Sequence, residues 1–497
     1  MILHTFVGFL KAQPKNTFLH QNNTKLALIK SISGIRGTIG GTIGDNLTPQ
    51  DIVSCTAAFG QWVLARHNNT VNSTTTNAAT IVIGRDARIS GEIVSQLVTA
   101  TLRSLGIHIV DLGLSTTPTV EIMVTELDAQ AGIILTASHN PKQWNALKLL
   151  NERGEFISAA DGAAVLSLID SPELQYATVD KLGTYTTNNT AIQLHIDKIF
   201  ALPLVHLDAV KSKQFTVVLD CVNSTGAISM IPLLEQMGCK VIAINSEMTG
   251  KFAHNPEPLP ENLQQLSTAV EANNAQLGIA VDPDVDRLVF VCEDGSMFSE
   301  EYTLVAIADY VLQHKKGNTV SNLSSTRALR DITEKVGGSY YASAVGEVNV
   351  VEMMKAQHAV IGGEGNGGVI YPDLHYGRDS LVGTALFLSF LAEFGKPVSF
   401  LRGKYPNYTI YKNKISLTND IDLDALFDGI EQKYRKQPIN KIDGLKIEFD
   451  NDWIHLRRSN TEPIIRIYAE STSEVTAASL VNKIKMDVSL LLKGELI

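Results

Sequence analysis

The chain has 497 residues, of which 44% are hydrophobic, and its formal net charge is -10. A chain of this length exceeds one hydrophobic core, so we expect about three or four domains. The lack of a basic cluster argues against a nucleic-acid partner, and no apolar run reaches the roughly 20 residues of a membrane helix. The four cysteines are scattered without a C-x-x-C pair, which favours buried thiols in a reducing cytoplasm over disulfides or a zinc site.

Two segments are predicted to lie outside the folded core. Residues 1–25 are expected to form a poorly ordered extension. Their apolar start has no basic residue before it and no clear cleavage site after it, so a signal peptide is the weaker alternative. Residues 68–77 are rich in asparagine and threonine and read as a surface-loop insertion.

The first α/β unit, predicted over residues 26–185, contains the serine loop, residues 136–141 (TASHNP). This loop follows the apolar run 132–135, a predicted buried strand, so Ser138 lies where a parallel sheet presents a ligand. His139 places a donor beside the hydroxyl. Lys148 lies in the next predicted strand, 146–150, and a hairpin there would bring its ammonium back to Ser138. The alternative is a polar loop without function.

The second α/β unit, predicted over residues 186–298, contains the aspartate loop, residues 282–287 (DPDVDR). Three carboxylates in so short a loop repel one another unless a cation lies among them. Mg²⁺ prefers oxygen ligands, whereas the loop lacks the glycine and terminal glutamate of an EF-hand Ca²⁺ site. Arg287 adds a fixed cation. Apolar strands on both sides argue against the alternative, a solvated acidic turn.

The third α/β unit, predicted over residues 299–405, contains the glycine loop, residues 362–368. Its glycines allow close backbone approach, while Glu364 and Asn366 offer groups suited to hydroxyls. From residue 406 to 497 the pattern changes to four antiparallel strands (408–417, 445–449, 453–456 and 464–469) and a helix from residue 473, an α+β unit. Its arginine loop, residues 457–463 (RRSNTEP), together with Arg466 on the next strand, suits a phosphate dianion.

In this order and spacing, the four loops resemble those of the α-D-phosphohexomutase family, which includes phosphoglucomutase/phosphomannomutase and phosphoglucosamine mutase. Residues 33–37, 84–88, 220–226 and 345–347 also match, so the resemblance extends from about residue 29 to the C-terminal helix. It implies an α/β fold of three similar domains with mixed sheets and a C-terminal α+β domain, arranged around a central cleft. A mobile C-terminal domain is a further hypothesis.

The resemblance implies a phosphoserine enzyme that interconverts hexose or hexosamine 6-phosphate and 1-phosphate through a 1,6-bisphosphate, which would also act as an activator. Ser138 would carry the phosphoryl group, Lys148 would be the general base, and His139 would orient the reacting oxygens. Burial and neighbouring cations should lower the pKa of this lysine. Arg36 and Arg287 would line the reaction centre. The implied ligands of Mg²⁺ are Ser138, Asp282, Asp284 and Asp286.

The same resemblance implies two groups of substrate-binding residues. Glu364 and Asn366 would bind sugar hydroxyls, with Glu347 close to the sugar. The phosphate that is not reacting would be bound by Arg457, Ser459, Asn460, Thr461 and Arg466.

The sequence gives mixed signals about the sugar. In the mannose/glucose branch the glycine loop commonly has serine where Asn366 stands and histidine where Gly368 stands, so the role of that histidine is absent unless His375 or another group substitutes. Glu347 stands where glucosamine mutases tend to carry an acid, which suits a protonated 2-amino group. Asn460 instead resembles the mannose/glucose branch. The mixture resembles archaeal-type phosphoglucosamine mutases, so we predict that activity, with phosphomannomutase/phosphoglucomutase as the alternative.

The expected partners are small-molecule sugar phosphates, without nucleic acid or membrane, for a cytoplasmic monomer or homodimer. A remote alternative is a catalytically silent sugar-phosphate sensor. The presence of Ser138, Lys148 and all three aspartates of the aspartate loop argues against it.

Overall fold

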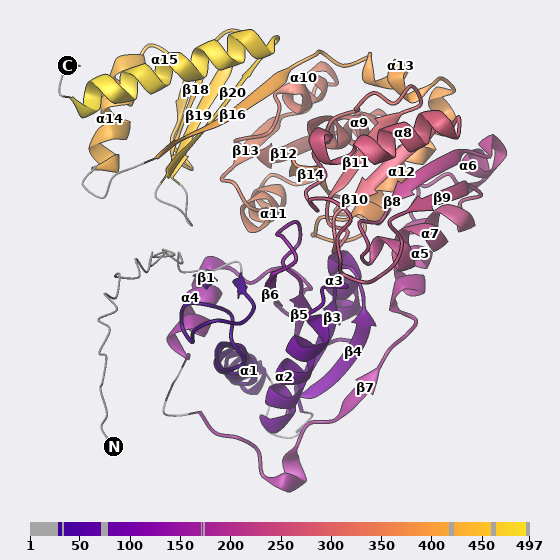
Figure 1. Ribbon diagram of the computed structural model, residues 1–497, viewed down its shortest axis with the longest axis vertical. Helices are drawn as coiled ribbons and strands as arrows, with labels where there is room; N and C mark the ends of the chain where they lie inside the picture. The colour runs from indigo at the N-terminus through magenta and orange to yellow at the C-terminus, as the bar shows by residue number, and fades with distance from the viewer. Residues whose placement is uncertain are drawn as a thin grey trace, which may run out of the picture.

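The computed structural model describes residues 28–31, 34–70, 78–169, 171, 174–416, 422–458 and 464–493. The expected extension (1–25), most of the expected insertion and residues 459–463 of the arginine loop therefore lie outside the described residues. Four sheets follow one another along the chain, with helices packed on each (Figure 1).

The N-terminal sheet has seven strands in the order β1-β2-β6-β5-β3-β4-β7. The pairs among β3, β4, β5 and β7 are parallel, and those involving β1, β2 and β6 are antiparallel, so the sheet is mixed. Its strands are β1 (Ile29–Ser31), β2 (Gly34–Thr38), β3 (Thr80–Arg85), β4 (His108–Leu114), β5 (Ala131–Leu135), β6 (Trp144–Leu150) and β7 (Tyr185–Thr187).

Both faces of this sheet are covered, which explains the continuous apolar runs of its central strands. Along β3, Ile81 and Ile83 point into a core that includes side chains of α1 (Pro49–Thr70), α2 (Gly91–Ser104) and α4 (Ala159–Ser167). Val82 points the other way, into a core with α3 (Thr117–Glu126). This alternation is the two-residue period of a strand. A 3-10 turn, Val179–Lys181, precedes β7.

The second and third sheets each have four strands, in the orders β11-β10-β8-β9 and β13-β12-β14-β15. In each, three strands are parallel and one edge strand, β11 or β15, is antiparallel. The strands are β8 (Thr216–Asp220), β9 (Lys240–Ile244), β10 (Leu277–Val281), β11 (Leu288–Cys292), β12 (Asn318–Asn322), β13 (Tyr340–Ser343), β14 (Ala359–Glu364) and β15 (Gly368–Ile370).

Helices of these two units pack on both sheets. In the second unit they are α5 (Ala191–Phe200), α6 (Leu207–Lys213), α7 (Gly226–Gln236) and α8 (Gln264–Ala272), with a 3-10 turn at Pro260–Asn262. In the third unit they are α9 (Glu300–His314), α10 (Ala328–Lys335), α11 (Glu347–Ala356), α12 (Ser380–Phe394) and α13 (Val398–Arg402).

The second and third units share one hydrophobic core. Helix α12 is buried from Ser380 to Ala392 and packs against α5, α6, α7 and α9. Its Phe387 stacks on Phe290 of β11 with ring centroids 3.8 Å apart, and Phe298 meets the same ring edge-on. A helix that is apolar on all sides must be enclosed in this way. The two sheets are therefore held together by a common core.

The C-terminal sheet is antiparallel throughout, in the order β16-β20-β19-β18-β17. Its strands are β16 (Thr409–Ser416), β17 (Ile439–Asn440), β18 (Leu445–Glu448), β19 (Trp453–Arg458) and β20 (Ile464–Ser471). Helices α14 (Leu423–Tyr434) and α15 (Glu474–Leu492) pack on it (Figure 1). The predicted strands and C-terminal helix are present, and α14 and β17 are additions.

Polar contacts join the C-terminal sheet to the third unit. Lys446 Nζ donates to the carbonyl of Leu323 at 2.9 Å, and Arg330 pairs with Glu448 at 2.7 Å. His455 Nδ1 lies 3.0 Å from Ser324 Oγ. These contacts fix the C-terminal sheet beside the third unit in this structure.

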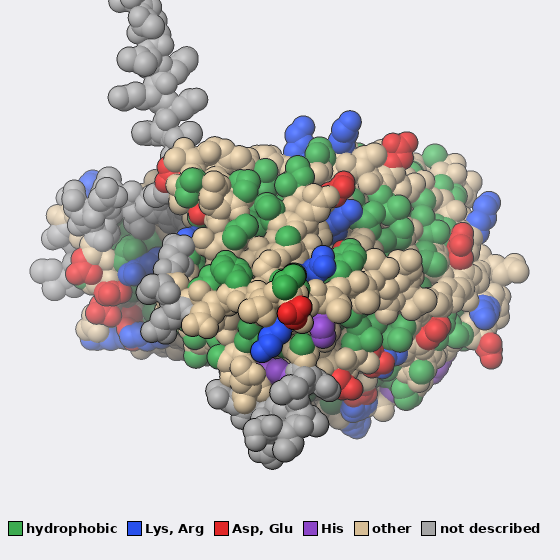
Figure 2. All heavy atoms as spheres, turned by 90° about the horizontal axis from the view of Figure 1, so that it is seen from below, with side chains coloured by type: hydrophobic (Ala, Val, Ile, Leu, Met, Phe, Trp, Pro, Cys, Tyr) green, Lys and Arg blue, Asp and Glu red, His purple; other side chains and the backbone are tan. Residues whose placement is uncertain are grey.

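The expected fold class is confirmed: mixed α/β sheets are followed by an α+β unit. The predicted residue limits of the units stay predictions. Among the described residues, every helix is too short or too polar to cross a membrane. On the face shown in Figure 2, described lysine and arginine side chains are scattered between acidic and apolar ones. All four cysteines are buried thiols.

Candidate active site

The serine loop turns sharply after β5 and buries its hydroxyl. Ser138 is 7% exposed and has a φ of +50°, in the left-handed region that few residues other than glycine and asparagine adopt. Its amide donates to Thr136 Oγ1 at 2.9 Å, and its Oγ donates to Asp282 Oδ2 at 2.6 Å. The serine that the sequence singled out therefore reaches the aspartate loop directly.

Arg88 fixes the shape of this loop. Its buried guanidinium donates to four main-chain carbonyls, those of Ser138, Asn140, Pro141 and Trp144. Its Nε pairs with Asp86 Oδ2 at 3.0 Å, and the same oxygen accepts from Thr136 Oγ1 at 2.7 Å. No role was predicted for Arg88, although residues 84–88 match the family. Its contacts identify it as a residue that positions the serine loop.

The aspartate loop brings its three carboxylates together. Asp282, Asp284 and Asp286 are all 0% exposed, and one oxygen from each lies within 4.8 Å of the others. Hydroxyls hold the loop from outside: Ser224 and Thr225 donate to the carbonyl of Pro283 at 2.7 and 2.8 Å. Thr117 Oγ1 donates to Asp284 Oδ2 at 2.6 Å. These contacts give a role to residues 220–226, which the sequence matched without explaining.

This cluster suits a divalent cation. In the part of the chain that the structure describes, Oδ1 of Asp284 and Oδ1 of Asp286 are buried without a hydrogen-bond partner. A buried carboxylate oxygen without a partner is costly, and a cation removes that cost. Burial raises the pKa of Asp282 well above its ordinary value, and the neighbouring Asp286 and Asp284 raise it further. Oxygen ligands of this kind are those that Mg²⁺ prefers.

Lys148 lies in β6, opposite Ile134 of β5, as the predicted hairpin requires. Its Nζ contacts the aspartate loop, at 2.7 Å from Asp284 Oδ2 and 3.2 Å from Asp286 Oδ2. Burial by itself lowers the pKa of Lys148, but the two carboxylates outweigh burial and raise it above its ordinary value. The prediction of a lowered pKa is wrong for this arrangement, because it counted neighbouring cations and missed these anions.

His139 and Arg287 complete the reaction centre. Arg287 Nη1 pairs with Glu257 at 3.2 Å, and its Nη2 lies 3.5 Å from His139 Nε2. Burial lowers the pKa of His139 well below its ordinary value, and the charge of Arg287 adds to that effect. A neutral imidazole that accepts from Arg287 at Nε2 carries its proton on Nδ1, which lies 3.3 Å from Ser138 Oγ. His139 is thus oriented as a donor to the serine oxygen, as the sequence suggested.

The glycine loop is a tight turn between β14 and β15. Glu364, at the end of β14, accepts from Asn322 Nδ2 at 2.7 Å and from the amide of Gly346 at 3.1 Å. Asn366 Nδ2 lies 3.5 Å from the second carboxylate oxygen of Glu364. Both expected hydroxyl-binding residues therefore lie together.

Arg378 is the residue of this region that the sequence did not single out. It forms ion pairs with Asp286, Glu364 and Glu347. His375, which the sequence offered as one substitute for the absent histidine, lies 3.3 Å from Asp379 Oδ2 and 3.4 Å from Glu121 Oε2. A Gly377-Arg-Asp triplet in front of an apolar helix, with Asp379 as its N-cap, is the signal that would have drawn attention to Arg378.

Cations line one face of the C-terminal sheet. Arg457 of β19 lies directly opposite Arg466 of β20, and Lys414 of β16 lies opposite Arg466 on its other side. Arg457 Nε pairs with Asp443 at 3.2 Å. Burial lowers the pKa of Arg36 in β2, and the positive charge of Arg466 lowers it further. The expected partners Ser459, Asn460 and Thr461 lie outside the described residues.

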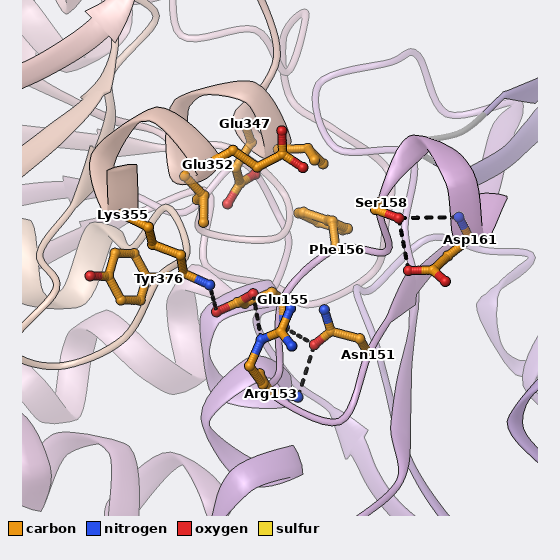
Figure 3. A pocket seen from close by; sticks show the side chains of 12 residues that line it. Asn151, Arg153, Glu155, Phe156, Ser158, Asp161, Glu347, Glu352, Lys355 and Tyr376 are labelled. Atoms are coloured by element: carbon orange, nitrogen blue, oxygen red, sulfur yellow. Dashed lines mark hydrogen bonds and ion pairs between the residues drawn. The ribbon is translucent and has the colours of Figure 1, made fainter. Parts of the chain in front are cut away.

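Figure 3 shows a hollow between the N-terminal unit and the third unit. It lies between residues 151–161, which follow β6, and helix α11 with Tyr376. Lys355 of α11 pairs with Glu155, which also pairs with Arg153 at 3.1 Å, so the Lys355–Glu155 ion pair connects the N-terminal unit to α11. Glu347 lines the hollow and pairs with Arg378, which in turn pairs with Asp286 of the aspartate loop.

Four family models match consecutive segments of the chain. The descriptions are phosphoglucomutase/phosphomannomutase α/β/α domain I for residues 28–175, domain II for 193–295, domain III for 299–408 and the C-terminal domain for 416–485. The chain belongs to the phosphoglucomutase/phosphomannomutase family. It is therefore an isomerase of the phosphohexomutase type, and the resemblance found in the four loops is confirmed.

Relatives of this phosphohexomutase carry two names. A probable phosphoglucosamine mutase of Methanopyrus kandleri is 31% identical over 90% of this chain and 95% of its own length. A phosphoglucomutase/phosphomannomutase of Thermococcus kodakarensis is 33% identical over 89% of this chain and 95% of its own. The crystal structure of a phosphoglucomutase/phosphomannomutase family protein from Burkholderia thailandensis has a TM-score of 0.80 and 25% identity, covering 95% of this chain and 98% of that one.

Proposed function

We propose that the chain is a phosphoglucosamine mutase, which interconverts glucosamine 6-phosphate and glucosamine 1-phosphate. The observation that carries the chemistry is the 2.6 Å hydrogen bond between Ser138 Oγ and Asp282, inside a buried cluster of three carboxylates. A nucleophilic oxygen beside a cation site is what phosphoryl transfer requires. The names of several relatives support the amino sugar.

In the proposed scheme Ser138 begins as a phosphoserine. A sugar hydroxyl oxygen attacks the phosphorus, and the bond between Ser138 Oγ and phosphorus breaks as the new bond forms. The products are a hexosamine 1,6-bisphosphate and a serine hydroxyl, which receives the proton that the sugar hydroxyl lost. Transfer of the other phosphoryl group to Ser138 then releases the isomeric monophosphate. On this scheme a trace of the 1,6-bisphosphate activates the enzyme, because the bisphosphate phosphorylates Ser138 in molecules where this serine is unphosphorylated.

The residues of the reaction centre have different proposed roles. His139 donates to the serine oxygen, and Arg287 places a fixed positive charge beside it. Lys148 can accept the sugar proton only as a neutral amine, and in the arrangement seen here Asp284 and Asp286 raise its pKa. A cation held by these two aspartates would offset their negative charge and so favour the neutral amine.

The residues that would hold Mg²⁺ are Asp282, Asp284 and Asp286, with Ser138 beside them. When bound, the ion supplies positive charge that neutralises phosphoryl oxygens. Arg36, Arg457 and Arg466 would bind the distant phosphate, while Glu364 and Asn366 would bind sugar hydroxyls. We place the enzyme in the cytoplasm, where the four buried thiols would stay reduced.

One observation favours a second candidate, phosphomannomutase/phosphoglucomutase. Glu347, the carboxylate expected to attract the 2-amino group, already accepts from the amide of Arg378 at 2.8 Å and pairs with its Nε at 3.1 Å. A carboxylate neutralised by an arginine discriminates weakly between an ammonium and a hydroxyl.

The deciding experiment compares kcat/KM for glucosamine 1-phosphate, mannose 1-phosphate and glucose 1-phosphate, with Mg²⁺ and a trace of the matching bisphosphate. A preference of about 100-fold for the amino sugar is expected, and Glu347→Gln should reduce it by about tenfold. Equal or better rates with the neutral hexoses would establish the second candidate. An EDTA-treated sample is the control, and turnover that survives it would remove the cation from the scheme.

A further inference from the structure

Arg378 has more charged partners than the sequence could show. It lies in the segment between β15 and α12 and is 8% exposed. Its Nη2 contacts Asp286 Oδ2 at 2.7 Å, its Nη1 contacts Glu364 Oε2 at 2.8 Å, and its Nε lies 3.1 Å from Glu347 Oε2. Two nitrogens of the guanidinium thus donate to carboxylates, and the third, Nε, lies at ion-pair distance from Glu347 without a hydrogen bond.

The three carboxylates belong to three separate pieces of the chain. Asp286 is in the aspartate loop of the second unit, Glu364 ends β14 in the third unit, and Glu347 begins α11. A guanidinium is planar and presents its donors in a fixed fork, so its partners must keep fixed positions relative to one another. Arg378 therefore links the glycine loop to the aspartate loop, beside the main-chain hydrogen bond from the amide of Leu288 to the carbonyl of Gly367.

Gly368 lies against the side chain of Arg378. A Cβ atom added at Gly368 would lie 2.3 Å from Cδ and 3.1 Å from Cγ of Arg378. No side chain fits at position 368 while the arginine keeps its place, because the atoms would overlap. The stem of Arg378 fills the space that a side chain at position 368 would otherwise use.

We propose that Arg378 is a positioning residue that couples sugar binding at Glu364 to cation binding at Asp286, and that it replaces the missing side chain at position 368. This inference rests on the proposed function, since it assigns the sugar to Glu364 and the cation to Asp286. Coupling of this kind is reciprocal: a ligand that improves the position of one carboxylate improves the binding of the other ligand by the same factor.

The first test measures Mg²⁺ binding by calorimetry, with and without saturating glucose 1-phosphate, for the wild type, Arg378→Lys and Arg378→Ala. In the wild type, the sugar phosphate should tighten Mg²⁺ binding by roughly 5- to 20-fold. In both variants this factor should fall to about one, and KM should rise by about tenfold or more. Arg103→Ala, a change at an exposed arginine of α2, is the matched control. A coupling factor that persists in Arg378→Lys would overturn the proposal.

The second test uses position 368; if Arg378→Ala does not fold, the Arg378→Lys arm of the first test still decides the proposal. Gly368→His alone should lower kcat/KM by about 100-fold, because the imidazole overlaps the arginine stem. Combined with Arg378→Ala it should recover about tenfold of that loss, since the space is then free. If the loss of kcat/KM in the double variant equals the product of the losses in the two single variants, the two side chains do not compete for one space. An unchanged kcat/KM in Gly368→His would lead to the same conclusion.

The proposed function and the coupling role of Arg378 can be contradicted separately. If the wild type turns over none of the three hexose phosphates, the proposed function is wrong, whatever Arg378 does. If the wild type is active and its Mg²⁺ affinity does not respond to the sugar phosphate, only the coupling role of Arg378 is wrong.

Discussion

The reaction centre and the cationic face of the C-terminal sheet hold their charged groups in different ways. At the reaction centre, Ser138 and the aspartates are buried, and each has partners at hydrogen-bond distance. On the C-terminal sheet, Arg457 and Arg466 lie side by side as like charges. Bond making needs fixed geometry, whereas holding the distant phosphate needs positive charge within reach. The difference suits a substrate that must present either of its ends to each site.

Ser138→Ala should have the largest effect on activity. We expect kcat to fall by a factor on the order of 10⁴ or more, because no oxygen remains to carry the phosphoryl group. The hydroxyl is buried and donates to Asp282, so its loss should also cost about 1–2 kcal/mol of unfolding free energy. Steady-state kinetics and urea denaturation measure the two effects.

Ser167→Ala, a change at a serine on α4 that bonds within its own helix, is the matched control and should leave kcat unchanged. Substantial turnover by Ser138→Ala would mean that phosphate passes between sugar positions without the serine.

A substitution on the C-terminal sheet should affect a different constant. Arg457→Ala is expected to raise KM for all three hexose phosphates by about 10- to 50-fold, with a much smaller change in kcat, because it removes charge from the distant phosphate. Arg458→Ala, on the same strand, removes an exposed ion pair with Asp424 and should change KM by less than about twofold. A change confined to the choice between sugars would show that Arg457 contacts the sugar instead.

The smallest effect concerns the contact between the C-terminal sheet and the third unit. Burial lowers the pKa of His455 to about 4, below its ordinary value of 6.5. As the pH falls through 6.5, the unfolded chain takes up a proton that the folded chain does not, so the folded state loses stability. Between about pH 7 and about pH 5.5 this should cost roughly 1 kcal/mol.

Calorimetric unfolding at several pH values checks this effect, with His455→Gln as the comparison. The variant should lose less stability on acidification than the wild type. Parallel curves for the two proteins would show that His455 titrates normally in the folded chain.

Much of the fold could be predicted because its central strands are continuous apolar runs. The runs that became β5, β10 and β11 are buried along their whole length, as a sheet covered on both faces requires. Helix α14 carried a signal that went unused: Asp422 caps it, and the buried Leu426, Ile430 and Tyr434 recur every four residues.

The site residues were predicted from local motifs. Contacts between residues that lie far apart in the sequence could not be predicted in this way. Arg378 meets a carboxylate 92 residues away in the sequence, and Lys148 meets one 136 residues away. Neither pairing has a periodicity or a spacing that reveals it. The sign of the Lys148 pKa shift was wrong for this reason, since the aspartates that raise it come from another unit.

The core shared through α12 has a consequence for motion. Because the second and third sheets are built on one set of packed side chains, they cannot slide past each other without opening that core. The aspartate loop and the glycine loop therefore move as one rigid body. We therefore expect any hinge in the described chain at the two ends of that body, where the N-terminal unit and the C-terminal sheet join it. In the proposed reaction, a bisphosphate that turns around would do so beside an immobile central body, and only the outer units would move to release it.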